Sequence, residues 1–191
     1  LRISLNNGET ILGKNRFSIH KPRARQYPYE HAFQDSLREE GNLTAIHDFI
    51  RVNVNGEDWG IMNIEENISK QFLEREGVKD SLVFRFSDDK RWLQYDRQVP
   101  DIYSEYRYSD SKLIATASRL SKYLENDISR KRYTYVLEER LKDEAIHLYE
   151  IKPHLKAFFA TLYWNNQHTL TDGNSRHYFS PFTLKLNPIT A

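Results

Sequence analysis

The chain has 191 residues, and its 28 Lys and Arg residues nearly balance its 27 Asp and Glu residues, giving a formal net charge of +1. This balance excludes binding to nucleic acid or to an anionic membrane through overall charge. Cysteine is absent, which excludes disulfides, thiol nucleophiles and cysteine metal sites. Aromatic residues make up 13% and hydrophobic residues 39% of the chain, enough apolar surface to predict a folded protein.

The hydropathy of the sequence and its first residues bear on targeting. No window approaches the roughly 18 consecutive apolar residues of a membrane span, so we expect no span in this fragment. The start, Leu-Arg-Ile-Ser-Leu, resembles neither a signal peptide nor an initiator methionine. We therefore expect an excised piece of a longer protein, and its compartment stays open.

Predicted strands dominate the first part of the chain. Residues 1–5 and 10–12 are expected to pair as a hairpin around Asn6-Asn7-Gly8, and residues 16–20 form another short alternating run. A helix of about three turns should follow, ended by Gly41. It is indicated by large side chains four residues apart, namely Tyr29, Phe33 and Leu37.

The clearest local pattern lies around Asn55-Gly56. Two alternating runs, residues 49–54 and 59–65, flank this pair. Asn-Gly is typical of a type I′ turn, which needs positive φ at both central residues, so the runs predict an antiparallel hairpin. Its first strand should place three apolar side chains on one face, namely Ile50, Val52 and Val54.

The remaining elements are mostly helical. Residues 69–75 predict a short helix ending at Gly77, and residues 82–86 predict a strand. Residues 88–110 lack clean periodicity. Three amphipathic helices are then expected, with apolar positions at Leu113, Ala117, Leu120 and Leu124; at Leu137, Leu141, Ala145 and Leu148; and at Leu155, Phe158, Phe159 and Leu162.

These elements predict an α+β fold. Its β-rich N-terminal part covers residues 1–87, a connecting loop covers residues 88–110, and a helical C-terminal part covers residues 111–191. A short hairpin, formed by residues 176–179 and 182–186, should close the chain.

Common catalytic motifs are absent from the sequence. It contains no glycine-rich phosphate loop, no His-Glu-x-x-His and no Gly-x-Ser-x-Gly, which disfavours common nucleotide-binding and hydrolase folds. The seven histidines are dispersed without paired spacing on one helix face, so packed or surface histidines are favoured over a zinc site.

A basic segment without acidic residues extends from Thr10 to Tyr29. It carries five cations, namely Lys14, Arg16, Lys21, Arg23 and Arg25. Such a segment can hold a phosphate, or it can be a solvated basic loop. The opposite charge occurs at Glu65-Glu66, where a carboxylate could pair with a lysine, help to hold a cation, or lie at the surface.

Three motifs, taken together, resemble those of one family. They are Leu12-Gly-Lys-Asn-Arg-Phe-Ser-Ile-His-Lys-Pro-Arg23; Asn55-Gly-Glu-Asp-Trp-Gly60 with Ile64-Glu65-Glu66; and His168-x-Leu170 to Asn174-x-Arg176-x-Tyr178-x-x-Pro181 with Leu186-Asn-Pro-Ile189. Their order is that seen in CotH-type proteins, which are spore-coat-like atypical protein kinases. The resemblance covers residues 1 to about 87 and about 150 to 191.

This resemblance implies a divergent protein-kinase-like fold. The implied activity is transfer of the γ-phosphoryl group of ATP to Ser or Thr of a protein substrate, with Mg²⁺ or Mn²⁺ as the metal. A spore coat or cell envelope location would be consistent with the family. We expect no nucleic-acid partner.

The resemblance also implies roles for particular residues. Three cations would face the phosphates, namely Lys14, Lys21 and Arg23. Glu65 would position a lysine, and Asn174 would hold the metal. His168 stands where the catalytic loop would begin. Because phosphates and metal meet at one site in a kinase, Lys21 and Arg23 are expected in one cleft with His168 and Asn174.

One departure from the family pattern leaves alternatives open. The family usually carries an aspartate close to the position of His168, whose neighbours here are Asn165, Asn166 and Gln167. Asp172 is the nearby acid and thus the candidate catalytic carboxylate. The alternatives are a degenerate pseudokinase that binds nucleotide or protein, and a structural coat or envelope assembly module without catalysis.

Overall fold

The computed structural model describes residues 1–6, 8–84, 125–140, 142, 145–170 and 175–190. These residues form a mixed α+β structure that divides into two compact units. The first unit comprises residues 1–80, 151–170 and 188–191, and the second comprises residues 81–150 and 171–187. The predicted division at residues 88–110 stays a prediction, as does the helix predicted around Leu113 to Leu124, because these segments lie outside the described residues.

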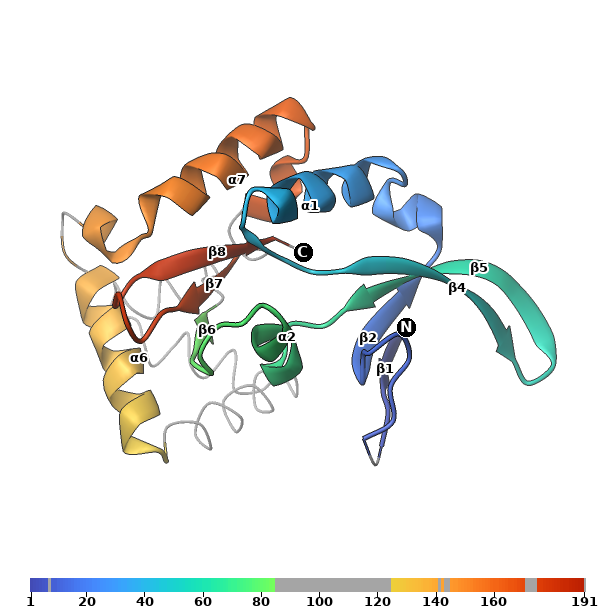
Figure 1. Cartoon of the computed structure of the whole chain (residues 1–191), viewed down its shortest axis with the longest axis horizontal. Helices are drawn as coiled ribbons and strands as arrows, with labels where there is room; N and C mark the ends of the chain where they lie inside the picture. Colours follow the sequence, from blue (N-terminus) through green and yellow to red (C-terminus); the bar gives the residue numbers. More distant parts are fainter. Residues whose placement is uncertain (7, 85–124, 141, 143–144, 171–174, 191) are drawn as a thin grey trace, which may run out of the picture. The chain divides into compact units, whose positions relative to one another are not determined.

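A four-stranded antiparallel sheet forms the centre of the first unit (Figure 1). The strand order is β1 (Arg2–Ser4), β2 (Arg16–His20), β5 (Glu57–Glu66) and β4 (His47–Val54). Because β5 lies between β2 and β4, it brings together side chains that are far apart in the sequence.

The partner of the first strand differs from the prediction. Residues 2–4 pair with residues 16–18, whereas we predicted pairing with residues 10–12. Residues 11 and 14 instead form a tight local bridge, and the Leu5 N–H donates to the Asn15 carbonyl at 2.8 Å. Residues 16–20, which we predicted as a separate alternating run, are therefore the strand that pairs with β1.

One face of this sheet is an apolar core. Its buried members are Phe17, Ile19, Met62 and Ile64, and the partly buried Ile3, Leu5, Ile50 and Val52 pack against them. Ile50 and Val52 share this face as predicted. Val54 is not part of the cluster, because the register shifts between Val52 and Asn53.

The antiparallel β4–β5 hairpin is confirmed. Asn55 has φ of 53° and Gly56 has φ of 87°, so both central residues adopt the left-handed region that a type I′ turn requires. The Gly56 N–H also donates to Asn53 Oδ1 at 3.0 Å.

Substituting Gly56→Ala tests the turn. No atom lies within 4 Å of the position that a Cβ would take, so the cost should come from the backbone alone. We expect a loss of about 1 kcal/mol in the free energy of unfolding, measured by urea denaturation, and a smaller loss for Gly56→Asn, since Asn tolerates positive φ. Equal losses for the two variants would contradict this explanation.

Two helices complete the first unit's main layers. α1 (Tyr29–Glu39) confirms the predicted helix and is followed by Gly41, with φ of 82°. α1 packs side by side with α7 (Ile151–Tyr163) (Figure 1). Their shared core consists of the buried Phe33, Leu37 and Ala157, with Ala160, Trp164 and Leu170 packed against them.

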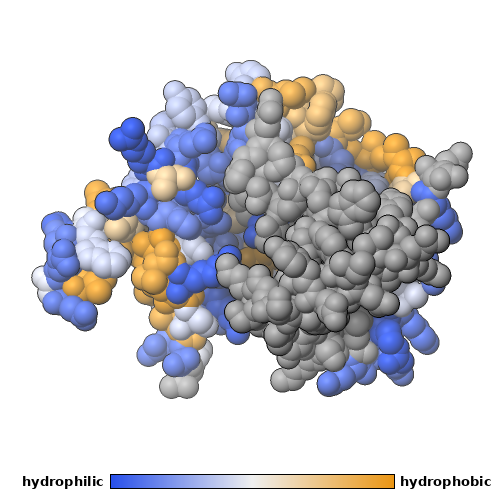
Figure 2. Space-filling model, turned by 180° about the vertical axis from the view of Figure 1, so that it is seen from behind, coloured by the Kyte–Doolittle hydropathy of each residue, from blue (hydrophilic) through white to orange (hydrophobic). Residues whose placement is uncertain are grey.

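The apolar stripe that predicted α7 does not form this core. Four of its residues are exposed, namely Leu155, Phe158, Phe159 and Leu162. Hydrophobic side chains therefore reach the surface over this helix (Figure 2). The buried face instead presents Ala157 and Thr161, because small side chains let α7 approach α1 closely.

Shorter elements connect these parts of the first unit. η1 (Pro22–Arg25) precedes α1, and η3 (Gln167–Leu170) follows α7. β3 (Leu43–Thr44) pairs in parallel with the last residues of β8 (Leu186–Thr190). α2 (Lys70–Arg75) confirms the predicted short helix, and Ser69 caps it by accepting the Phe72 N–H at 3.4 Å.

The second unit has its own core. In it, β6 (Val83–Phe84) pairs antiparallel with β7 (Arg176–Phe179). α6 (Asp127–Arg140) and η2 (Ala145–Leu148) complete the described part of this unit. Its buried side chains are Leu82, Phe84, Val136, Leu148, Phe179 and Leu186.

Two predictions for this unit need correction. The helix placed over residues 137–148 begins at Asp127 and ends at Arg140, with a separate 3₁₀ turn at residues 145–148. The second strand of the terminal hairpin begins at Leu186 rather than at residue 182. Residues 180–185 form the turn, in which the Ser180 N–H donates to the Lys185 carbonyl at 2.9 Å.

Among the described residues, no helix is long and apolar enough to cross a membrane.

Candidate functional site

The second face of the β2–β5–β4 sheet is polar. Side chains alternate along β5, so Met62 and Ile64 enter the apolar core while Asn63 and Glu65 point to the other side. Both polar side chains are buried; Asn63 is 0% and Glu65 8% exposed. A buried carboxylate and a buried amide on one strand indicate a site rather than a solvated surface.

Four further side chains lie next to Asn63 and Glu65, two from the neighbouring strands and two from η1 and α1. His47 lies opposite Glu65 on β4, and His20 lies opposite Asn63 on β2. Arg25 of η1 and His31 of α1 lie over them. We define the polar cluster by six residues, namely His20, Arg25, His31, His47, Asn63 and Glu65.

Direct contacts hold the cluster together. The Arg25 Nη2 forms an ion pair with Glu65 Oε2, and His20 Nε2 lies 3.6 Å from the same oxygen. The Asn63 amide contacts His47 Nδ1 at 3.2 Å. The rings of His31 and His47 are 5.2 Å apart. Two charged groups, three imidazoles and one amide therefore lie together on one face of the sheet, with the buried Asn63 and Glu65 beneath partly buried side chains.

Many polar atoms of the cluster lack a hydrogen bond to any residue that the structure describes. These buried atoms are His20 Nε2, Arg25 Nε, His31 Nδ1 and Nε2, His47 Nε2, Asn63 Oδ1 and Glu65 Oε2. Of these atoms, Glu65 Oε2 still has the ion pair with Arg25. A buried polar atom without a partner costs about 1–3 kcal/mol, so this arrangement is not the one that stability alone favours.

The cluster disfavours protonation of His47 and of His20. Burial, and then the charges of His31 and Arg25, lower the pKa of His47 to about 3, although its hydrogen bond with Asn63 opposes this change. Burial and the charge of Arg25 also lower the pKa of His20, against the opposing influence of Glu65. His47 is therefore neutral at physiological pH.

Aromatic rings flank the imidazoles. His31 stacks on Phe49, with ring centroids 4.7 Å apart and an angle of 10° between the planes. Tyr27 meets both rings edge-on, at 5.2 Å from His31 and 5.0 Å from Phe49. These contacts fix the position of η1 and the first turn of α1 over the polar face.

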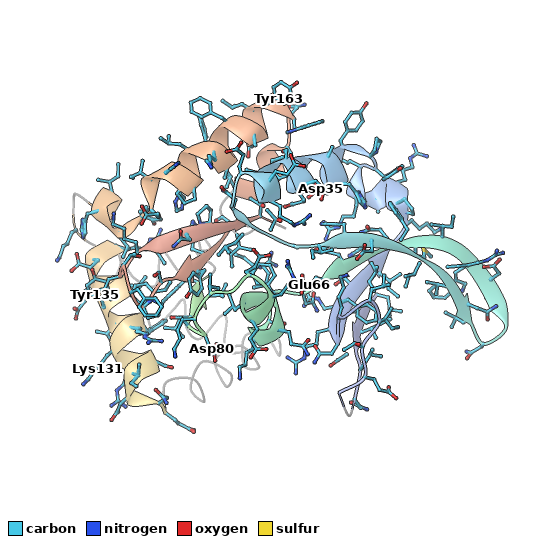
Figure 3. All side chains as sticks on the ribbon, in the orientation of Figure 1. Asp35, Glu66, Asp80, Lys131, Tyr135 and Tyr163 are labelled. Atoms are coloured by element: carbon cyan, nitrogen blue, oxygen red, sulfur yellow. The ribbon has the colours of Figure 1, made fainter. Side chains whose placement is uncertain are left out.

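A second, partly buried ion pair lies on the other side of β5. Glu66, labelled in Figure 3, accepts a hydrogen bond from Arg75 Nη2 at 2.7 Å. The same arginine contacts Glu76 at 2.5 Å and donates to the Thr44 carbonyl at 3.3 Å. Burial raises the pKa of Glu76 against the influence of Arg75. This pair ties α2 to the sheet and to β3, which is a structural role.

The structure places the predicted phosphate-facing residues in different surroundings. Lys14 is only 5% exposed, and its Nζ lies 2.5 Å from Asp48 Oδ2, so it is committed to an ion pair. Lys21 and Arg23 are exposed at the start of η1. Glu65 contacts Arg25 and His20, so the cation that it holds is an arginine rather than the expected lysine.

The predicted site residues of the C-terminal part are His168, Asp172 and Asn174. Asp172 and Asn174 lie outside the described residues, and His168 is described only by its backbone, within η3. The expected proximity of Lys21 and Arg23 to this segment stays a prediction.

Sequence reasoning missed most of the polar cluster. Arg25 was part of the basic segment, but His20, His31, His47 and Asn63 were not predicted as site residues. The polar residues at alternate positions of β5 were the available signal, because a strand with one apolar face and one buried polar face is unusual.

The fold and the cluster together define a mixed α+β protein with a buried polar site on one sheet face. Comparison with protein-family models gave no match, and no curated protein sequence matches the chain. In the part of the chain that the structure describes, no group of three His, Asp or Glu side chains is arranged to hold a metal ion.

Proposed function

We propose that the chain is part of a CotH-like protein kinase, which transfers the γ-phosphoryl group of ATP to Ser or Thr of a protein substrate. The three sequence motifs in their order support this proposal. The observation that carries it furthest is the ion pair between Arg25 and the buried Glu65, which anchors the basic segment to the central strand of a sheet.

This anchor suits phosphate binding. With Arg25 held by Glu65, η1 presents Lys21 and Arg23 to solvent on the same short turn. Exposed Lys and Arg side chains donate charge-assisted hydrogen bonds to phosphate oxygens, and an anchored turn loses less conformational entropy when they bind. Lys21 and Arg23 would therefore contact the phosphates, and Arg25 would position them.

The metal would be held outside the described residues. Phosphoryl transfer from ATP requires Mg²⁺ or Mn²⁺, which neutralises charge on the phosphate oxygens. The polar cluster does not suit this metal, because Mg²⁺ prefers oxygen ligands and Arg25 already occupies the Glu65 carboxylate. Asn174 supplies the amide oxygen for this role, and Asp172 is the acid that would orient the acceptor hydroxyl.

A pseudokinase is the second candidate. The residues just before His168 are Asn165, Asn166 and Gln167, where the family usually carries an acid. Asn166 also donates a hydrogen bond to Glu30 at 2.8 Å, so it is engaged within the fold. A protein that binds ATP without transferring phosphate would favour this candidate, and a protein that binds no nucleotide would favour a structural module.

Substituting Lys21→Ala tests the phosphate contact. We expect the dissociation constant for ATP in the full-length protein to rise about tenfold, the effect of losing one charge-assisted contact of about 1.4 kcal/mol. Isothermal titration calorimetry measures this constant. The matched control is Lys70→Ala, which removes an exposed lysine of α2.

The control should bind ATP like the wild type. If Lys21→Ala also binds ATP with unchanged affinity, the basic segment is a solvated loop and does not contact phosphate. Incubation of the wild type with labelled ATP then separates the kinase, which becomes labelled or labels a protein substrate, from the pseudokinase.

A further inference from the structure

The polar cluster lies beneath a segment that is attached to the sheet mainly through polar and aromatic contacts. We define this cover segment as residues 22–33, which comprise η1 and the start of α1 (Figure 1). Its contacts with the sheet are the Arg25–Glu65 ion pair and the rings of Tyr27 and His31 against Phe49 and His47. At its C-terminal end, Phe33 of the cover segment packs with Ala157, together with Leu37 further along α1. The cover segment is thus anchored by apolar contacts at one end.

The charges around His47 oppose its protonation from several elements. Arg25 of η1 and both His31 and Arg38 of α1 face it, and each disfavours a positive imidazole. Asn63 of β5 contacts its Nδ1.

The only carboxylate of the cluster does not offset these charges. Glu65 is opposite His47 in register, but it is already paired with Arg25. On β2, His20 faces Arg25, Arg2 and the N-terminal amine of Leu1, with Glu65 as the opposing charge. A proton added to either imidazole therefore meets more positive than negative charge.

We propose that the cover segment is a proton-sensitive latch, in which protonation of His47 releases residues 22–33 from the β2–β5–β4 sheet. Release separates Arg25 from Glu65 and exposes the polar face of β5 to solvent. This inference does not depend on the proposed kinase activity, because it rests only on the contacts and charges of the polar cluster.

The direction of the pH response follows from the two states of His47. With the latch closed its pKa is about 3, whereas in the open state it should return to the ordinary value near 6.5. A pKa lowered by closure means that protons bind preferentially to the open state. The closed state is therefore fully favoured above about pH 6.5 and loses this advantage as the pH falls toward 3.

The size of the response follows from one proton. Below about pH 6 and down to about pH 3, a single histidine that is protonated only in the open state should raise the open population about tenfold for each pH unit. Between pH 7.5 and 5.0, His47 alone should raise it about 30-fold.

Hydrogen–deuterium exchange followed by mass spectrometry measures this opening. After correction for the intrinsic pH dependence of exchange, the protection factors of residues 22–33 should fall about 30-fold between pH 7.5 and 5.0. Those of residues 60–66 in β5 should change less than threefold. An equal fall in both segments would mean that the whole unit unfolds, and would overturn the proposal.

Two histidine variants assign the effect. His47→Gln keeps an amide next to Asn63 but cannot be protonated, so the fall in protection of residues 22–33 should shrink to the smaller part that His20 contributes. His147→Gln is the matched control, since His147 is an exposed histidine beside Glu139 in the second unit, and the 30-fold fall should persist. A full response in His47→Gln would refute the latch.

An independent measurement needs no variant. In NMR titrations of the wild type, the His47 imidazole of the closed state should remain neutral between pH 7.5 and 5.0. Titration of His47 near pH 6.5 without loss of protection in residues 22–33 would show that closure does not exclude the proton, and would also refute the latch.

Discussion

Replacing Phe33 with alanine is expected to lower the free energy of unfolding of the first unit by about 4 kcal/mol. Phe33 is 0% exposed and sits between α1 and α7, in the cluster that also contains Leu37 and Ala157. Truncation of a buried phenylalanine removes its transfer free energy and leaves a cavity, because the surrounding helices relax only partially. Such a loss is a large part of the 5–15 kcal/mol that typically stabilises a domain.

Urea denaturation monitored by tryptophan fluorescence measures this change, because Trp164 packs against the Phe33 cluster. The control is Tyr29→Ala, one turn earlier on α1, where the side chain is 62% exposed. This control should change the free energy of unfolding by no more than about 0.5 kcal/mol. Similar, small effects of both substitutions would mean that α1 does not pack on α7 through Phe33.

The sequence predicted best those elements whose signals are local. The Asn55-Gly56 turn needs positive φ at two adjacent positions, and few residue pairs allow it. Similarly, the four-residue spacing from Tyr29 to Leu37, followed by Gly41, predicted α1 correctly. In each case the information lies within about a dozen residues.

Predictions failed where two patterns of similar strength competed. On α7, one stripe consists of large apolar residues such as Leu155 and Phe159, and the other of small residues such as Ala157 and Thr161. Hydrophobicity alone favours the first stripe, but the second allows close packing against α1. Likewise, β1 could pair with residues 10–12 or with residues 16–20, and the tight bridge between residues 11 and 14 excludes the former.

The polar cluster could not be predicted from local sequence patterns, for a different reason. Its histidines are separated by 11 and 16 residues along the chain, at His20, His31 and His47, and share no helix face or strand. Only the placement of β5 between β2 and β4 brings His20 and His47 to the same face as Glu65. Pairing between distant strands depends on the whole fold, and so one sequence could not place these side chains together.

Substituting Asn174→Ala in the full-length protein is expected to reduce metal-dependent phosphoryl transfer on the order of 1,000-fold. In the proposed kinase this amide would hold the metal, so removing it would remove a metal ligand. Because the substitution changes a single polar side chain in the segment between η3 and β7, we expect no change in the cooperative unfolding transition.

The assay uses labelled ATP with Mg²⁺ or Mn²⁺ and measures autophosphorylation at several metal concentrations. Asn6→Ala, which removes an exposed asparagine before β2, is the control and should retain full activity. A true metal ligand also has a signature that a structural residue lacks, because an Asn174→Asp variant restores an oxygen ligand and should regain part of the activity with a changed preference between Mg²⁺ and Mn²⁺. Activity that survives Asn174→Ala unchanged would remove this residue from the metal site, whereas loss in both variants with an altered unfolding transition would assign it a structural role.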